Sequence, residues 1–148
     1  MKNGNLQYQF ARLNAAEKLI AINVAVFLLI NLLAVLIGLR TDSIMNWFEL
    51  PEDFFTFLTQ PWSLVTYSFL HGGFGHIFWN MILLYFFGRL FFNLFDSDRF
   101  YAVYFLGVIA GGLLFMLGYN IFPTLSDSSS VLVGASAGVT AILIFICT

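Results

Sequence analysis

The chain has 148 residues, of which 60% are hydrophobic and only 9% are charged, and its formal net charge is -2. A soluble domain usually carries about 25% charged residues, so this composition excludes an ordinary water-facing surface and predicts a polytopic membrane protein. Six Lys and Arg residues give no electrostatic basis for binding nucleic acid, and the single cysteine, Cys147, excludes an internal disulfide framework.

The first predicted membrane span covers residues 19–39 and follows a polar lead, residues 1–18, that shows no signal-peptide pattern. As a helix the span would be about 31 Å long, which matches a hydrocarbon core about 30 Å thick. Asn14, with Glu17 three residues later, has the pattern of a capping box, so the helix is expected to begin before the membrane. Two asparagines inside the span are interpreted as hydrogen-bonding to other helices: Asn23 and Asn31.

Residues 40–70 are too many for a tight turn and too aromatic for an ordinary loop. Aromatic side chains next to acidic ones suit the boundary between membrane and water, so we expect a folded loop that lies partly in this interface. One short helix is expected to be capped by Asp42 or Ser43. A second is expected to begin at Pro51, with Glu52 and Asp53 in its first turn, because proline and acidic residues are favoured near a helix N-terminus.

Three further spans are predicted, and they cover residues 74–92, 101–122 and 131–148. Gly107 and Gly111 in the third span form a small-x-x-x-small pattern, which gives a helix a flat face for close packing. The sequence ends while the fourth span is still apolar, so we expect a chain that is truncated within this span. The predicted fold is therefore all-α, a polytopic transmembrane helical bundle formed by a single membrane domain over residues 19–148.

Basic residues set the expected orientation, because cytoplasmic loops carry an excess of Lys and Arg. Three lie in the N-terminal lead and two, Arg89 and Arg99, flank the loop after the second span, whereas the loop before the fourth span has none. The N-terminus is therefore predicted to be cytosolic, and the long first loop to lie outside. His76 and Ser136 then both lie near the outer ends of their spans. The expected location is a bacterial inner membrane.

Two polar residues of the second span, His76 and Asn80, are four apart and share one face of a helix. Donors that point into a cavity within the membrane can hold a developing oxyanion, and polar residues in a span are functional candidates by default. The alternative is that the two side chains only satisfy each other or neighbouring backbone groups. His71, at the start of this span, is interpreted as making a structural hydrogen bond to the loop backbone.

Ser136 lies in the sequence Gly134-Ala135-Ser136-Ala137-Gly138, near the start of the last apolar run. The Gly-x-Ser-x-Gly pattern also marks the nucleophile elbow of soluble hydrolases, but that elbow needs an α/β sheet around it, which this membrane context does not provide. A serine at the start of a helix lies beside free backbone N–H groups that can contribute to an oxyanion site. The alternative is a packing seam, because Gly134 and Gly138 are a small-x-x-x-small pair.

Together these segments resemble the rhomboid family of intramembrane serine proteases. The resemblance rests on three features in chain order: Trp62 nine residues before His71, the run His71-x4-His76-x3-Asn80 in the second span, and the Gly-x-Ser motif at Ser136. The long aromatic first loop and the Gly-rich third span also fit the family. The resemblance therefore covers nearly the whole chain.

This resemblance implies proteolysis of transmembrane protein substrates near the outer face of the membrane. It assigns Ser136 the position of the nucleophile, and it assigns His76 and Asn80, with the backbone N–H of Ser136, the positions of the oxyanion hole. The structural positions are those of Trp62, His71, Gly134 and Gly138. It implies no metal and no cofactor, and the expected partners are transmembrane substrates and the lipid bilayer, without nucleic acid.

Three departures from the family pattern affect these expectations. Ser63 stands where an arginine commonly follows the tryptophan, and apolar Phe91 and Phe92 stand where the family often has a glutamate. The third is the general-base histidine, which rhomboids carry on their sixth helix. A serine hydroxyl needs such a base, so these 148 residues alone are expected to be inactive. Two alternatives stay open: a rhomboid-like pseudoprotease that binds membrane clients without cleaving them, and a packing fragment of a transporter.

Overall fold

The structure is a computed structural model that describes residues 6–122 and 130–148. In chain order its elements are α1 (Leu6–Arg12), α2 (Ala15–Ile37), α3 (Thr41–Met45), β1 (Leu50–Pro51), α4 (Phe54–Thr59), α5 (Ser63–Thr66), the 3-10 helix η1 (Tyr67–Phe69), α6 (Phe74–Phe91), α7 (Ser97–Ile121), β2 (Val131–Leu132) and α8 (Ser136–Cys147). The start of the N-terminal lead and most of the polar loop before the fourth predicted span lie outside the described residues.

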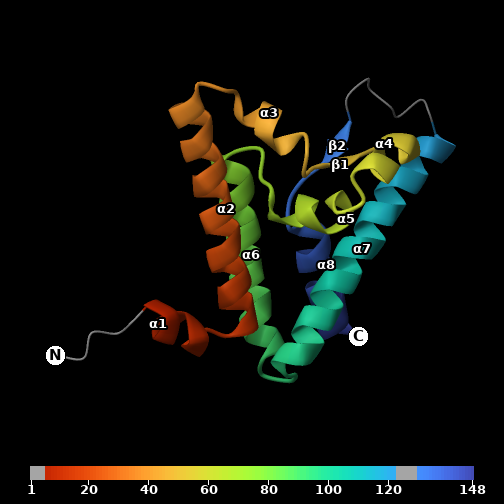
Figure 1. Cartoon of the computed structure of the whole chain (residues 1–148). Coiled ribbons are helices and arrows are strands. Elements are labelled where there is room, and N and C mark those ends of the chain that lie inside the picture. The colour runs from red at the N-terminus through yellow and green to blue at the C-terminus, as the bar shows by residue number, and fades with distance from the viewer. Residues whose placement is uncertain (1–5, 123–129) are drawn as a thin grey trace.

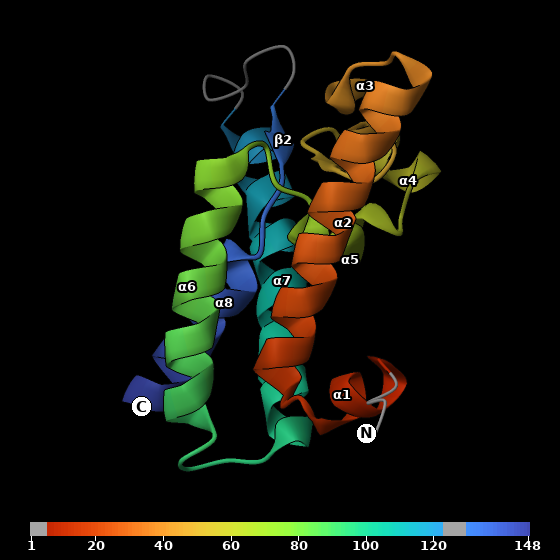
Figure 2. The same cartoon turned by 90° about the vertical axis from the view of Figure 1, so that its left-hand side faces the viewer.

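Helices α2, α6, α7 and α8 pack together as a bundle. Figure 1 shows α3, α4 and the β1–β2 strand pair at one end of this bundle, and α1 with the α6–α7 connection at the opposite end. Figure 2 shows the same division from the side. Within the described residues, α2, α6 and α7 are long and apolar enough to cross a membrane. The prediction of an all-α transmembrane bundle is confirmed, with one two-residue strand pair added to it.

The fourth predicted span, 131–148, is wrong in its first five residues. Val131 and Leu132 form β2, which pairs antiparallel with Pro51 and Leu50 of β1. Both figures show the chain descending from β2 into the bundle before α8 begins. α8 therefore begins only at Ser136, inside the bundle. Hydropathy alone does not separate a buried extended segment from a helix, which is why the sequence pattern misplaced this boundary.

The start of α2 follows the capping-box prediction. The side chain of Asn14 accepts a hydrogen bond from the Glu17 N–H, and the Glu17 carboxylate accepts one from the Asn14 N–H, each at 2.9 Å. The helix before it, α1, was not predicted from the sequence. Asn23 and Asn31 each donate to a carbonyl one turn back in their own helix, at 2.8 Å, and among the described residues only Asn23 also lies near a polar group of another helix, the Tyr104 hydroxyl. The bond to the helix's own backbone satisfies one amide N–H of each side chain in apolar surroundings.

The first loop is folded, as predicted, but its helices begin elsewhere. α3 begins at Thr41 and has no side-chain cap, so neither Asp42 nor Ser43 caps it. Pro51 lies in β1 instead of starting a helix. The Asp53 carboxylate caps α4 by accepting the Thr56 N–H at 2.6 Å. Proline suits this strand because an edge strand leaves some N–H groups unpaired. A proline is therefore compatible with an edge strand as well as with the start of a helix, and the sequence alone does not distinguish the two.

Small residues allow α7 and α8 to pack closely, as the small-x-x-x-small pattern predicts. A Cβ atom on Gly107 would overlap the Cβ of Ala141 in α8. A Cβ atom on Gly111 would lie 2.6 Å from the Cβ of Ala137, which is too close for a real contact. The close approach fixes the first turn of α8, which contains Ser136, against the middle of α7.

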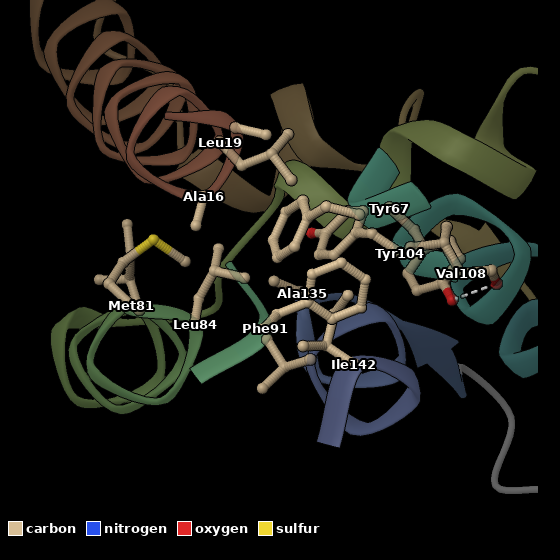
Figure 3. Packing of buried hydrophobic residues seen from close by; sticks show 14 of the residues in the cluster. Ala16, Leu19, Tyr67, Met81, Leu84, Phe91, Tyr104, Val108, Ala135 and Ile142 are labelled. Atoms are coloured by element: carbon tan, nitrogen blue, oxygen red, sulfur yellow. Dashed lines mark hydrogen bonds between the residues drawn. The ribbon is translucent and has the colours of Figure 1, made fainter. Parts of the chain in front are cut away.

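The buried core joins the helices around aromatic side chains (Figure 3). Near the end of α6, Phe91 is fully buried, and its ring centroid lies 5.4 Å from that of Phe100 in α7 and 5.6 Å from that of Phe145 in α8. Edge-on and tilted ring contacts of this kind add to the free energy of apolar burial. Aromatic packing therefore links three helices at the place where the family often has a glutamate.

Candidate active site

The start of α6 presents the two predicted oxyanion-hole residues. His76 lies in the first turn and is exposed, whereas Asn80, one turn later, is buried. The Asn80 side-chain amide donates to the His76 carbonyl at 2.9 Å. An amide NH₂ group has two N–H donors, so this bond leaves one of them available for another acceptor. The structure thus agrees in part with the alternative interpretation, in which the two side chains only satisfy each other or the backbone, because Asn80 does bond to a neighbouring backbone group.

His71 lies against His76 just before α6 begins. Its ring centroid is 5.1 Å from that of His76, the ring planes make an angle of 67°, and the residue is 4% exposed. Neither ring nitrogen has a hydrogen-bond partner of normal geometry in the described parts of the chain. The backbone of Phe69, in the same loop, does interact with the His71 ring, so the expected bond to the loop backbone is present only outside normal hydrogen-bond geometry.

Burial also sets the protonation of this residue. The pKa of His71 is lowered from 6.5 to about 4, mainly because burial disfavours the charged ring, and the neighbouring His76 acts in the same direction. The backbone of Phe69 lies close enough to offset part of this effect. His71 is consequently neutral near pH 7.

The segment between β2 and α8, residues 133–135, brings the Gly-x-Ser motif to these histidines, and we call it the strap. Gly134 has a φ of +113° and is buried, and its N–H donates to the Tyr67 carbonyl at 2.9 Å. A Cβ atom on Gly134 would lie 2.6 Å from His76 Nε2. The His76 ring therefore packs directly on the backbone of the strap. The backbone of Gly134 has a conformation there that only glycine adopts easily.

Ser136 is the first residue of α8 and is exposed. No side chain caps this helix, so its first backbone N–H groups are free of intrahelical partners and point out from its positive end. No hydrogen bond joins the Ser136 hydroxyl to either histidine in the part of the chain that the structure describes. The structure therefore brings His71, His76 and the strap together and places Ser136 two residues beyond the contact, but it does not pair the hydroxyl with a base.

The remaining predicted residues support this arrangement. The Trp62 indole N–H donates to the Trp47 carbonyl at 2.7 Å, which ties two parts of the first loop together. Gly138 lies against the ring of Tyr104, where a Cβ atom would be 2.5 Å from Cε2. The glycine pair of the motif thus has two uses, since Gly134 admits a histidine and Gly138 packs on α7. The described residues contain no group of three or more His, Cys, Asp or Glu side chains that would hold a metal ion.

Sequence reasoning missed Tyr67, which lies at the centre of this site. It is fully buried, its hydroxyl donates to the Val108 carbonyl of α7 at 2.7 Å, and its own carbonyl holds Gly134. A tyrosine in an aromatic loop carries no local signal of this role, because its partners lie 41 and 67 residues further along the chain.

A model of the Rhomboid domain matches residues 58–148, more than half of the chain. The matched segment contains the two histidines, Asn80, the strap and α8. A comparison with curated proteins found no match.

Proposed function

Because the chain belongs to the rhomboid family, we propose that it is an intramembrane serine endopeptidase that cleaves transmembrane protein substrates near the outer face of the membrane. It is an integral membrane protein with three described helices long enough to span a bilayer. The observation that carries the proposal is the contact between the His76 ring and Gly134, two residues before Ser136. This contact joins the His-Asn pair of one helix to the serine motif of another.

In the proposed reaction the Ser136 Oγ attacks the carbonyl carbon of the scissile peptide bond, and its proton passes to a general base. The oxyanion that forms is held by His76, by the second N–H of the Asn80 amide and by the Ser136 backbone N–H, which the start of α8 leaves free. The C–N bond then breaks, and the base returns the proton to the leaving amine. Water attacks the acyl-serine ester in the second half of the reaction and releases Ser136.

The proposal places the general base outside residues 1–148. Among the described residues, neither His71 nor His76 hydrogen-bonds to Ser136, and His71 is buried. The family resemblance supplies a histidine on a sixth helix for this purpose. A serine without a base is a weak nucleophile, so activity belongs to the protein that includes this histidine.

The proposed location is a bacterial inner membrane, and the distribution of charge supports an N-terminus in the cytosol. Arg12 and Lys18 lie near the start of α2, and Arg89 and Arg99 lie near the α6–α7 connection, which is at the same end of the bundle (Figure 1). The first loop, at the opposite end, is acidic. Excess basic charge marks the cytoplasmic side, so the first loop and the start of α6 face outward in this proposal.

Cleavage of a transmembrane reporter by the protein expressed from its natural gene tests the proposal. We expect Ser136→Ala to lower cleavage by about 10⁶-fold, as loss of a serine nucleophile does in other hydrolases. Ser63→Ala is the control, because it removes the hydroxyl of a buried serine in α5 that has no hydrogen-bond partner in the described part of the chain, and it should cleave normally. Cleavage by Ser136→Ala at the wild-type level would exclude Ser136 as nucleophile. A reporter that binds to both proteins and is cut by neither would favour the client-binding alternative.

A further inference from the structure

Tyr67 links the candidate nucleophile segment to the middle of α7. Its phenol hydroxyl donates to the Val108 carbonyl at 2.7 Å, drawn as the dashed line in Figure 3. Its backbone carbonyl accepts the N–H of Gly134 at 2.9 Å. One fully buried residue thus holds a spanning helix with its side chain and the strap with its backbone.

The surface of α7 has a slot for this ring. A Cβ atom on Gly112 would lie 3.2 Å from Tyr67 Cε1, and one on Gly111 would lie 3.5 Å from the Tyr67 hydroxyl. Both glycines face the first loop and α8 at the same level of the helix, so the absence of side chains there lets the ring reach the backbone. A ring in a slot with one hydrogen bond at its far end has little freedom to rotate or slide.

We propose that Tyr67 is a positioning residue that sets the place of Ser136 by acting through Gly134, a role that rests on the proposed function. The β1–β2 pair fixes Val131 and Leu132 just before the strap, and the Tyr67 carbonyl holds the strap at Gly134, two residues later. Among the described residues, this is the last backbone hydrogen bond from another element before Ser136. Gly134 also contacts the His76 ring, so a shift of Tyr67 would move both the proposed nucleophile and a residue of the proposed oxyanion hole.

The hydroxyl is the part of Tyr67 that can be tested without unfolding the protein. Burial raises the pKa of Tyr67 to about 12, so the phenol stays protonated and remains a donor. Val108 lies within the continuous helix α7, so its carbonyl keeps an intrahelical partner when the phenol is removed. Tyr67→Phe keeps the ring in its slot and removes only the hydrogen bond that fixes it.

The test compares Tyr67→Phe with Tyr104→Phe in the protein expressed from its natural gene. Tyr104 is also fully buried, and its hydroxyl lies near the Ser68 and Asn23 side chains without a hydrogen bond of normal geometry among the described residues. We expect Tyr67→Phe to lower kcat for the reporter about tenfold with KM unchanged, because an imprecisely placed nucleophile slows chemistry and not binding. Fluorophosphonate labelling of Ser136 should slow by the same factor, and Tyr104→Phe should match the wild type in both assays.

A second measurement does not depend on activity. Hydrogen exchange of the peptide that contains Gly134 should be faster in Tyr67→Phe than in the wild type or in Tyr104→Phe, since the acceptor of its N–H is less firmly held. Unchanged exchange together with wild-type kcat overturns the positioning role. A loss of activity explained entirely by less folded protein overturns it as well. If Ser136→Ala cleaves as the wild type does, the proposed function itself fails, and that result is distinct from either of these.

Discussion

Adding one methyl group to the strap, with Gly134→Ala, should disable the site without touching a reacting atom. The new Cβ would lie 2.6 Å from His76 Nε2 and 2.8 Å from Cε1. Because non-bonded heavy atoms prefer separations of about 3.5 Å or more, the ring or the strap must withdraw by about 1 Å. The φ of +113° adds backbone strain of about 1–3 kcal/mol for any residue with a Cβ atom.

A displacement of about 1 Å in a catalytic arrangement costs about 10²-fold in rate, so we expect a loss of this size in reporter cleavage. Thermal unfolding in detergent should show destabilisation of about 1–3 kcal/mol. Gly75→Ala is the matched control, because it adds the same methyl group beside His76 where no atom lies within 4 Å. It should cleave normally and be slightly more stable, since alanine favours a helix over glycine.

A double variant separates the two causes. If the methyl group acts by contacting the ring, Gly134→Ala should destabilise the protein less when His76 is already alanine. The reasoning is refuted if Gly134→Ala cleaves at the wild-type rate, or if its instability is the same with and without the His76 ring.

Three further predictions concern stability. The pKa of His71 is about 4 in the folded protein, against an ordinary value of 6.5 in the unfolded chain. Between these pH values the folded state binds fewer protons than the unfolded state. The free energy of unfolding should therefore fall by about 2 kcal/mol as the pH drops from about 6.5 to about 4. Thermal unfolding of His71→Gln, which lacks this titration, should depend less on pH over the same range. Asn14→Ala should cost about 1 kcal/mol through loss of the capping box, measured by the same method. Gly107→Leu should destabilise the folded protein by at least about 2 kcal/mol, because the new side chain would overlap Ala141. Gly118→Ala is the control and should not destabilise it, because the space around Gly118 is open. Equal effects of the two substitutions would exclude the α7–α8 contact as the cause.

Local signals in the sequence predicted much of the fold. Asn14 and Glu17 predict the start of α2 because a capping box is formed entirely by neighbouring residues. Gly107 and Gly111 predict a close helix contact for the same reason, although they do not identify the partner as α8. Composition is sufficient for the membrane assignment, since a chain with so few charged residues cannot form the water-facing surface of an ordinary soluble domain.

The features that sequence missed depend on contacts between distant segments. Pro51 has the local properties of a helix start, but pairing with Val131, far along the chain, makes it part of a strand. The boundary of α8 was misplaced because residues 131–135, which precede the helix, are as apolar as the helix itself.

The candidate site shows the same division. The four-residue spacing of His76 and Asn80 correctly places them one turn apart, and the Asn80 bond to the His76 carbonyl follows from that spacing. The contact of His76 with Gly134 and the two bonds of Tyr67 cannot be read locally, because each needs the packing of α6, α7 and the strap.

The most direct measurement of the central claim is to expose the protein, expressed from its natural gene in membranes, to a fluorophosphonate and to locate the adduct by mass spectrometry. A serine that is activated as a nucleophile reacts, whereas the many other serine hydroxyls of the chain do not. The account predicts a single adduct on Ser136, lost together with reporter cleavage in Ser136→Ala. An adduct on a different residue, or cleavage that continues with Ser136 unmodified, would contradict it.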